Sequence, residues 1–221
     1  MAYLFVGLDK SDEELGIRAQ NIWALKDYDH DAAFARFDKL DFPASEVPAV
    51  DDLPAVFLGS ASAKDGDWSR RHPGKAAMTV LCPVRAEWFQ AWAGGKIKHR
   101  GEEYRRVKAA WTELLLESMY KHWPMTKGHV TYTDLGTPLS NDFYLASVKG
   151  EVYGLENTAE RYNSADALVA LHPQTQIPGL YLTGQDTLNV GVVSALVSGV
   201  FTAVRISYGA ALLCLLECVI A

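Results

Sequence analysis

Apolar runs of strand length recur along the chain, and polar, glycine- or proline-containing segments separate them. Short apolar runs bounded by turn residues are typical of β-strands. They predict strands at Tyr3–Leu8, Ile22–Leu25, Pro54–Ser60, Ala76–Pro83, Gly128–Asp134 and Gly179–Thr183.

Apolar residues at helical spacing predict helices between these strands. Asp29 is placed to cap a helix over residues 30–40, in which Ala33, Phe34 and Phe37 share a face. A second helix is predicted over Ala86–Ala93, the longest over Gly101–His122 before Pro124, and the last from near Leu188 to at least Arg205. The longest helix carries an apolar stripe of Tyr104, Val107, Trp111, Leu114, Leu115 and Met119. Strands and helices do not alternate regularly, so the pattern favours an α+β fold.

Three segments between these elements are predicted to be loops. They are residues 41–53, residues 61–74 and the long, Asn-, Pro- and Gly-punctuated stretch Thr137–Pro178, which is predicted to form surface connections.

Composition excludes several classes of protein. The 221 residues are 49% hydrophobic and 22% charged, which is enough apolar material for a core and excludes disorder. The net charge of -6 and the lack of a long basic run argue against nucleic acid as a partner. Three cysteines, with Cys214 and Cys218 one helical turn apart, indicate reduced thiols.

Common catalytic and binding motifs are missing from the chain. The six histidines have no metal-ligand spacing, and there is no G-x-S-x-G elbow, P-loop or G-x-G-x-x-G. The acidic groups at residues 12–14 and 51–52 lie in polar, turn-like sequence and are read as solvated surface. The sequence therefore predicts no metal site.

The segment Pro178–Val200 carries the most informative pattern. It consists of a turn, a strand, Gly184, Asp186 and then a helix. Gly184 would let backbone approach a ligand closely, and the free N–H groups at the helix start favour an anion or an electron-rich ring edge. Asp186 could accept hydrogen bonds from ligand hydroxyls. By residue chemistry alone, an ordinary strand–turn–helix with Asp186 near the cap is the simpler interpretation.

Several motifs resemble a known family in sequence and order. The segments "GLYLTGQD" and "TPLSNDFYLASVKGEVYG", supported more loosely by "EWFQAW" and "RGEEYRRVK", are similar to the C-terminal part of the phytoene-desaturase-like FAD-dependent oxidoreductases. The resemblance covers about residues 3–204.

The resemblance implies a fold and a function. The fold would be an antiparallel substrate-lobe sheet with helices over residues 1–177, the closing FAD-binding strand and helix over 178–205, and a hydrophobic tail over 206–221. The activity would be saturation of a carbon–carbon double bond in a lipophilic, retinoid- or carotenoid-like polyene, with FAD as cofactor and NAD or NADP as a candidate electron source. Gly184, Gln185 and Asp186 would contact the FAD ribityl and diphosphate, and Gly191, Val192 and Val193 would place helix N–H groups near the flavin.

Two features depart from the family pattern. The FAD-binding βαβ region with the dinucleotide glycines has no counterpart here, so the resemblance implies a C-terminal portion. Ser194 stands where a glycine is expected. The alternative function is a catalytically inactive, truncated remnant that binds a hydrophobic ligand or a protein.

The proton donor cannot be assigned from sequence. Tyr144 and Tyr153 carry hydroxyls within the family-like segment, but packing is the more common role for such residues. Trp88, Phe89 and Trp92 would line a lipid path or, more simply, belong to the core. Asn141 and Asn157 are interpreted as turn formers.

Location is implied by the resemblance and by the tail. The family suggests association with the endoplasmic reticulum membrane, although no targeting signal occurs at the start of the chain. Residues 206–221 are strongly apolar but too short to span a bilayer, so the tail is expected to make peripheral membrane contact.

Overall fold

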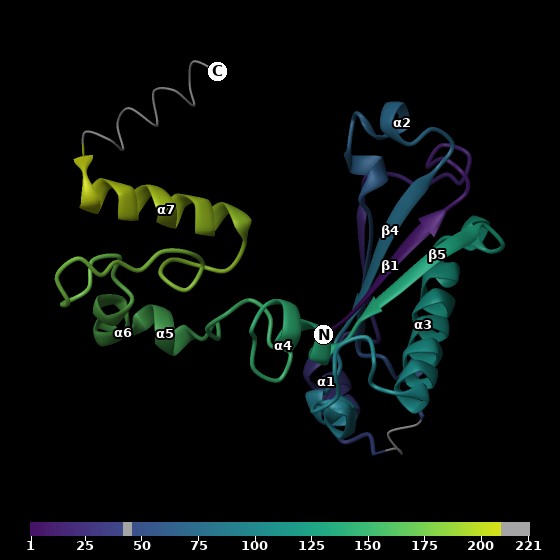
Figure 1. The fold of residues 1–221 in the computed structure, drawn as a ribbon, viewed down its shortest axis with the longest axis horizontal. Coiled ribbons are helices and arrows are strands. Elements are labelled where there is room, and N and C mark those ends of the chain that lie inside the picture. Colours follow the sequence, from purple (N-terminus) through teal and green to yellow (C-terminus); the bar gives the residue numbers. More distant parts are fainter. Residues whose placement is uncertain (42–45, 209–221) are drawn as a thin grey trace. The chain divides into compact units, whose positions relative to one another are not determined.

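The computed structural model describes residues 1–41 and 46–208. Contacts between residues divide the chain into two compact units, an N-terminal unit, Met1–Glu151, and a C-terminal unit, Val152–Ala221 (Figure 1). Cys214, Cys218 and residues 209–221 of the predicted tail lie outside the described residues. The predicted division of the chain at residue 178 stays a prediction.

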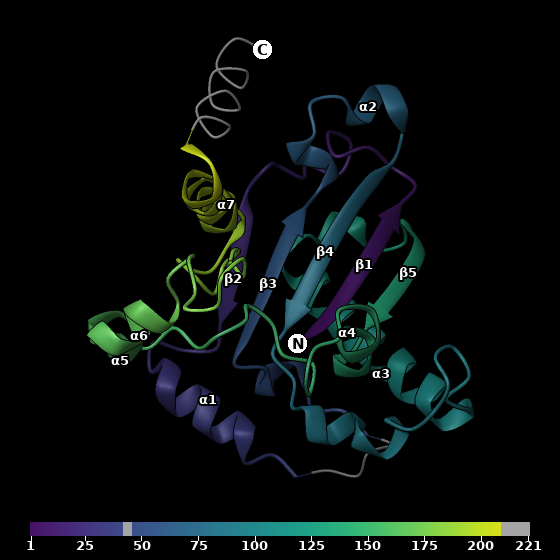
Figure 2. The ribbon, with the colours of Figure 1, turned by 60° about the vertical axis from the view of Figure 1, so that its left-hand side comes forward.

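A five-stranded sheet forms the centre of the N-terminal unit (Figure 2). Its order is β2-β3-β4-β1-β5, and each neighbouring pair is antiparallel. The strands are β1 (Ala2–Leu8), β2 (Asn21–Leu25), β3 (Ala55–Ser60), β4 (Ala76–Cys82) and β5 (Val130–Gly136). Five of the six predicted strands and the α+β class with an antiparallel sheet are confirmed; β5 begins and ends two residues later than predicted.

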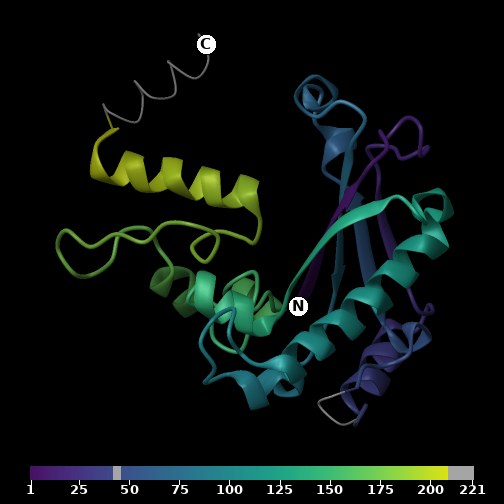
Figure 3. The same ribbon diagram turned by 45° about the vertical axis from the view of Figure 1, so that its right-hand side comes forward.

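One face of the sheet is covered by the helix α3 (Glu102–His122), as Figure 3 shows. Residues that alternate along β1 and β4 point to this face and are buried, including Leu4, Val6, Met78 and Val80. All six residues of the predicted apolar stripe of α3 are buried. Each large apolar side chain removed from water in this way contributes roughly 1.5–3 kcal/mol, so this layer supplies most of the unit's stability.

The shorter helix α1 (His30–Asp38) starts at its predicted cap. The Asp29 carboxylate accepts a hydrogen bond from the Ala32 N–H at 3.0 Å. This N–H lies in the first turn and has no backbone partner within the helix, so the cap satisfies it. Ala33 and Phe37 are buried, but Phe34 is exposed, so the prediction that all three share the packed face is wrong for Phe34.

The segment around Trp88 is a 3₁₀-helix, η3 (Ala86–Trp92), in place of the predicted ordinary helix. Its three aromatic side chains are buried, and the Trp88 ring stacks on Trp111 of α3 with 6.0 Å between centroids. Trp88, Phe89 and Trp92 therefore belong to the core.

Short helices complete the N-terminal unit. They are η1 (Val50–Asp52), η2 (Ser62–Lys64), α2 (Trp68–Arg71), η4 (Pro124–Thr126) and α4 (Pro138–Tyr144). The predicted loop over residues 61–74 thus contains two short helical turns.

The other face of the sheet carries a row of apolar side chains. Trp23 pairs with Phe57, Phe57 with Leu81, and Leu81 with Tyr3, so the row crosses four strands in register. Trp23 is 65% exposed although its ring packs edge-on against Phe57 at 4.9 Å. This face therefore offers an accessible apolar surface beside β5.

The C-terminal unit is built from three helices and connecting loops. The helices are α5 (Ala159–Asn163), α6 (Ala165–Ala170) and α7 (Val192–Ile206). The helices α4, α5 and α6 lie within the stretch Thr137–Pro178, so the prediction of long surface connections is wrong where these helices form. Side-chain caps help these helices to form. The Thr158 hydroxyl accepts from the Arg161 N–H at the start of α5, and the Ser164 hydroxyl accepts from the Ala167 N–H at the start of α6.

Two further predictions for this unit, a strand and the start of the last helix, are also wrong. No strand forms over Gly179–Thr183 within the described residues; only Tyr181 makes a bridge, to Gln174. A strand needs a partner along its length, and one bridge does not supply it. The last helix begins at Val192 instead of near Leu188, because Gly191 has φ +109°, which a right-handed helix cannot contain.

Neither a membrane span nor a metal site is found among the residues that the structure describes. None of their helices combines the length and the apolar character that crossing a membrane requires. Nor do His, Cys, Asp or Glu side chains among them gather in a group that could hold a metal ion.

Candidate functional site

The segment before α7 is held to that helix by two buried hydroxyls. Ser198 and Thr202 lie one turn apart on α7. The Gly184 N–H donates to the Ser198 hydroxyl at 3.0 Å, and the Thr202 hydroxyl donates to the Leu182 carbonyl at 2.9 Å. The Thr187 hydroxyl also contacts Ser198 and donates to the Gly184 carbonyl at 2.8 Å. These bonds hold residues 182–187 against the second and third turns of α7.

Two glycines leave open space at this turn. Gly184 has φ +105° and Gly191 has φ +109°, a region that L side chains rarely adopt. A Cβ built on either residue would meet no heavy atom within 4 Å. Both backbone segments are therefore accessible to a ligand that approaches closely.

The helix α7 begins without a side-chain cap. Gly191 occupies the cap position, and Val192 and Val193 follow as exposed residues of the first turn. Helix starts expose backbone N–H groups and the positive end of the helix dipole, which together favour an anion. Ser194, in place of the expected glycine, lies half-buried in the same turn.

Gln185 and Asp186 connect this turn to its surroundings. The Gln185 side-chain oxygen accepts from the Gly191 N–H at 3.4 Å. One oxygen of the exposed Asp186 carboxylate accepts from the Leu155 N–H at 2.9 Å, and its backbone carbonyl accepts from the Arg161 guanidinium at 2.7 Å. The second carboxylate oxygen has no partner among the described residues, so it can accept a hydrogen bond from a ligand hydroxyl.

All six predicted FAD-binding residues lie in one short region of the C-terminal unit. The Gln185 side chain links the residue after Gly184 to Gly191. The start of α7 offers N–H donors, and the Asp186 carboxylate offers an acceptor. An accessible glycine turn, an uncapped helix start and a free carboxylate oxygen fit a cofactor with a diphosphate and hydroxyl groups. Their role in binding FAD stays a prediction.

The structure gives physical reasons for the glycines of the family-like segment 137–154. At Gly150, with φ +66°, any side chain would collide with Pro138 of α4. At Gly154, also with φ +66°, a side chain would collide with the Asp186 carboxylate. The Asp142 carboxylate accepts from the Gly150 N–H at 2.6 Å, which holds the two ends of the segment 142–150 together.

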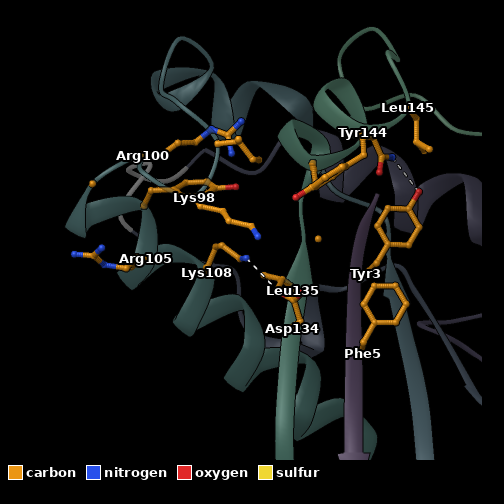
Figure 4. Close-up of a pocket in the computed structure, with 16 residues that line it drawn as sticks. Tyr3, Phe5, Lys98, Arg100, Arg105, Lys108, Asp134, Leu135, Tyr144 and Leu145 are labelled. Carbon is orange, nitrogen blue, oxygen red and sulfur yellow. Dashed lines mark hydrogen bonds and ion pairs between the residues drawn. The ribbon is translucent and has the colours of Figure 1, made fainter.

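A cavity of about 530 Å³ lies within the N-terminal unit, where β1, the end of β5, the start of α3 and α4 meet (Figure 4). Its apolar wall includes Tyr3, Phe5, Leu135 and Leu145. Four basic residues also line it: Lys98, Arg100, Arg105 and Lys108.

The tyrosine and asparagine candidates fall in different places. Tyr144 lines this cavity, whereas Tyr153 is exposed in the C-terminal unit with φ +71°. Asn141 is buried in α4 and donates to the Tyr3 hydroxyl at 3.1 Å and to the Gly150 carbonyl at 3.3 Å, so the turn interpretation is wrong for Asn141. Asn157 precedes α5 and accepts from the Tyr162 hydroxyl at 2.5 Å.

Sequence reasoning missed residues that shape both regions. Ser198 and Thr202 could have been found, since two hydroxyls four positions apart interrupt an otherwise apolar helix. Arg161 and the basic residues around the cavity gave no such signal. Their positions depend on loops that bring distant parts of the chain together.

Comparison with known proteins gives a consistent result. The chain is 34% identical to all-trans-retinol 13,14-reductase from Danio rerio over 193 residues, which cover 87% of this chain and 31% of that protein. It is also 34% identical to the Homo sapiens protein of the same name over 196 residues, 89% of this chain and 31% of that protein. A Danio rerio protein named inactive all-trans-retinol 13,14-reductase is 29% identical over 196 residues, with the same coverage of both chains as the human protein.

These matches confirm the resemblance expected from the motifs. The chain is similar to the all-trans-retinol 13,14-reductases along nearly its whole length, and it spans about a third (31%) of theirs. No family model matches the chain.

Proposed function

From its relationship to the all-trans-retinol 13,14-reductases, we propose that this chain is the C-terminal portion of an FAD-dependent oxidoreductase that saturates a carbon–carbon double bond of a retinoid-like polyene. The observation that carries the proposal is the accessible region formed by Gly184, Gln185, Asp186 and the start of α7 in a chain 34% identical to these reductases. The retinoid substrate is inferred from the relatives' names.

The residues of this region have distinct tasks in the proposal. Backbone N–H groups of Val192 and Val193 would face an electron-rich edge of FAD, where the helix dipole stabilises negative charge. Gly184 would allow close backbone approach, and the free Asp186 oxygen would accept a hydrogen bond from a ribityl hydroxyl. When bound, FAD supplies the hydride chemistry, with NADH or NADPH as the proposed electron source.

The remaining requirement is a protein environment for the polyene and for proton delivery. The accessible apolar row on the sheet, Trp23, Phe57, Leu81 and Tyr3, would exclude water from an apolar ligand. Tyr144 lines the cavity and is our candidate proton donor, because a tyrosine hydroxyl can act as a general acid.

A second candidate function is an inactive binding module. It is favoured by the 29% identity to a relative named inactive and by the lack of a G-x-G-x-x-G motif in these 221 residues. In that case the chain would bind a hydrophobic ligand or a protein without chemistry.

A chimera decides between the two functions. Residues 1–205 would replace the matching segment of the Danio rerio all-trans-retinol 13,14-reductase, and the product formed from all-trans-retinol would be identified by mass spectrometry. Formation of the dihydro product, with flavin retained after purification, supports the proposal. A folded, flavin-containing chimera that never forms it would favour the inactive module.

Matched variants test the assigned site in the same chimera. Asp186→Asn keeps an acceptor for the Leu155 N–H but removes the charge and changes the second acceptor, so we expect flavin occupancy to fall several-fold. Asp51→Asn, at an exposed carboxylate of the N-terminal unit, is the control and should leave the visible flavin spectrum unchanged. Equal flavin content in both variants would contradict the assignment.

A further inference from the structure

We propose that Asn141 selects a ligand with a terminal hydroxyl group in the cavity of the N-terminal unit, because its side-chain oxygen accepts the hydroxyl proton. The inference rests on the proposed function for the polyene nature of the ligand, and it adds the residue that recognises the polar end of an alcohol. Its evidence is an oriented acceptor that has no protein partner and lies at a cavity rich in donors.

Asn141 is almost completely buried in α4, and its amide nitrogen is fully used by the protein. The residue is 6% exposed. The amide nitrogen donates to the Tyr3 hydroxyl at 3.1 Å and to the Gly150 carbonyl at 3.3 Å. A side-chain amide nitrogen carries two protons, so these two bonds occupy both of them. What Asn141 still offers to a ligand is therefore its side-chain oxygen, Oδ1.

The Gly150 carbonyl fixes the orientation of the Asn141 amide. A carbonyl only accepts hydrogen bonds, so a flipped amide would bring two acceptors together and lose this bond. The segment that carries Gly150 is itself held by Asp142, whose carboxylate accepts from the Gly150 N–H at 2.6 Å and from the Ser147 hydroxyl at 3.1 Å. The Oδ1 acceptor is thus oriented before any ligand binds.

The Oδ1 atom of Asn141 has no hydrogen-bond partner among the described residues, yet it is not enclosed. In that part of the chain, the Nε of Arg100 is the only side-chain polar atom that is both completely buried and without a partner. The Asn141 oxygen therefore keeps contact with open space, and the cavity of about 530 Å³ that Asn141 lines supplies that space. An acceptor in such a place costs free energy until a donor pairs with it.

Most other polar side chains at the cavity carry donors. Lys98 and Arg100 line it and form no ion pair with any described residue, whereas the Lys108 amine lies 3.6 Å from the Asp134 carboxylate. Lys98 and Lys108 point toward the same space in Figure 4. Because Lys98 is exposed, water solvates its charge, and its amine can donate to a neutral oxygen. An alcohol suits this set, since its hydroxyl donates to Asn141 and its oxygen accepts from an amine. An ether, an ester or a carboxylate has no proton to donate and would leave Oδ1 unpaired.

The remainder of the cavity suits the apolar part of such an alcohol. Its apolar lining includes Tyr3, Phe5, Leu135 and Leu145. In all-trans-retinol, the double bond that the relatives' name specifies adjoins the carbon that bears the hydroxyl. A hydroxyl held at Asn141 would therefore bring this bond to the cavity that Tyr144, our candidate proton donor, also lines. Asn141 would act as a positioning residue as well as a selective one.

Equilibrium binding to the full 221-residue chain tests the inference without flavin or turnover. The probe is all-trans-retinol, whose polyene is fluorescent. The control ligand is all-trans-retinyl methyl ether, which has the same polyene but no hydroxyl proton. We expect wild type to bind the alcohol about tenfold more tightly than the ether, the order of one hydrogen bond to an acceptor that is otherwise left unpaired.

Two variants separate the acceptor from the segment that it helps to hold. Asn141→Leu is similar in size and removes the acceptor, so the advantage of the alcohol over the ether should fall below about twofold. Asp142→Ala is the matched control, because it removes the bonds to Ser147 and Gly150 in the same segment but Asp142 does not line the cavity. Its preference for the alcohol should equal that of wild type. Should Asn141→Leu fail to fold, the smaller Asn141→Ala takes its place.

Each outcome decides the inference. A preference for the alcohol that is lost in the folded Asn141 variant and kept in Asp142→Ala supports it. Equal affinity of wild type for the two ligands, or no binding of either, overturns it. A preference that persists without Asn141, or that disappears equally in Asp142→Ala, also overturns it. The chimera can form the dihydro product without this preference, and an inactive chimera can show it, so the proposed function and this inference fail separately.

Discussion

The N-terminal and C-terminal units differ in what they bury. Every buried apolar side chain of the described residues lies in the N-terminal unit, in a core that includes Leu4, Val80, Trp111 and Leu115. Among residues 152–208 the buried side chains are those of Ser198 and Thr202. The first unit is therefore stabilised by apolar burial, and the second is shaped mainly by hydrogen bonds.

The difference continues on the surface. The helix α7 exposes apolar side chains, with Val192 77% and Leu196 68% exposed, while its hydroxyls face inward. Exposed apolar surface of this kind marks contact with another molecule or chain segment. The N-terminal unit thus has an apolar core of its own, whereas residues 152–208 bury no apolar side chain among the described residues.

The largest expected effect is loss of core volume in the N-terminal unit. Trp111→Ala would remove a side chain that is 1% exposed and contacts Trp88 and Phe89, and the cavity should cost about 3–5 kcal/mol of unfolding free energy. Urea unfolding followed by far-UV circular dichroism measures it. Phe201→Ala, at a half-exposed site on α7, is the matched control and should change this transition by less than about 0.5 kcal/mol. Equal losses would remove the contrast between the units.

A smaller effect is expected at the helix caps. Asp29→Ala removes the acceptor of the Ala32 N–H and should cost about 1 kcal/mol in the same transition. Thr158→Ala removes the corresponding bond to the Arg161 N–H in the C-terminal unit. The C-terminal unit contributes little to the apolar core, so we expect the midpoint of the main unfolding transition to stay at its original urea concentration. A shift as large as that of Asp29→Ala would show that the two units unfold together.

The smallest effect concerns pH. The Lys121 amine donates to Asp51 at 2.8 Å and lowers the pKa of that exposed carboxyl in the folded state. A lowered folded-state pKa stabilises the fold above the unfolded pKa, about 3.9, and this stabilisation is lost as pH falls through the folded value. Wild type should therefore lose slightly more stability than Asp51→Asn when urea unfolding at pH 6 is compared with pH 3. Identical losses would show that the pair contributes nothing.

This pH dependence belongs to one unit. The ion pairs among described residues lie in the N-terminal unit, and residues 152–208 form none with one another. Raising NaCl should reduce the difference between wild type and Asp51→Asn, because both partners are exposed.

Sequence patterns predicted the N-terminal unit well because its core imposes period-two and helical spacings on the chain. The five strands and the buried stripe of α3 follow from those spacings. The predicted strand at Gly179–Thr183 failed because its apolar residues have no strand to pair with among the described residues. Apolar character alone does not supply that partner.

The two candidate regions were predictable to different degrees. Gly184 to Val193 are contiguous in sequence, so a sequence motif alone can identify them. The cavity combines Tyr3, residues 97–108 and residues 134–145, and only the fold brings these together. The free charge of Lys98 and Arg100 also depends on which acids lie nearby, which no local pattern contains.

Amide hydrogen exchange of the chimera with and without FAD tests the central claim most directly. The account predicts that FAD slows exchange over residues 184–196, where Gly184 and the start of α7 would meet the cofactor, and leaves β3 and α1 of the N-terminal unit unchanged. Flavin bound at full occupancy with no change in exchange over residues 184–196 would contradict it.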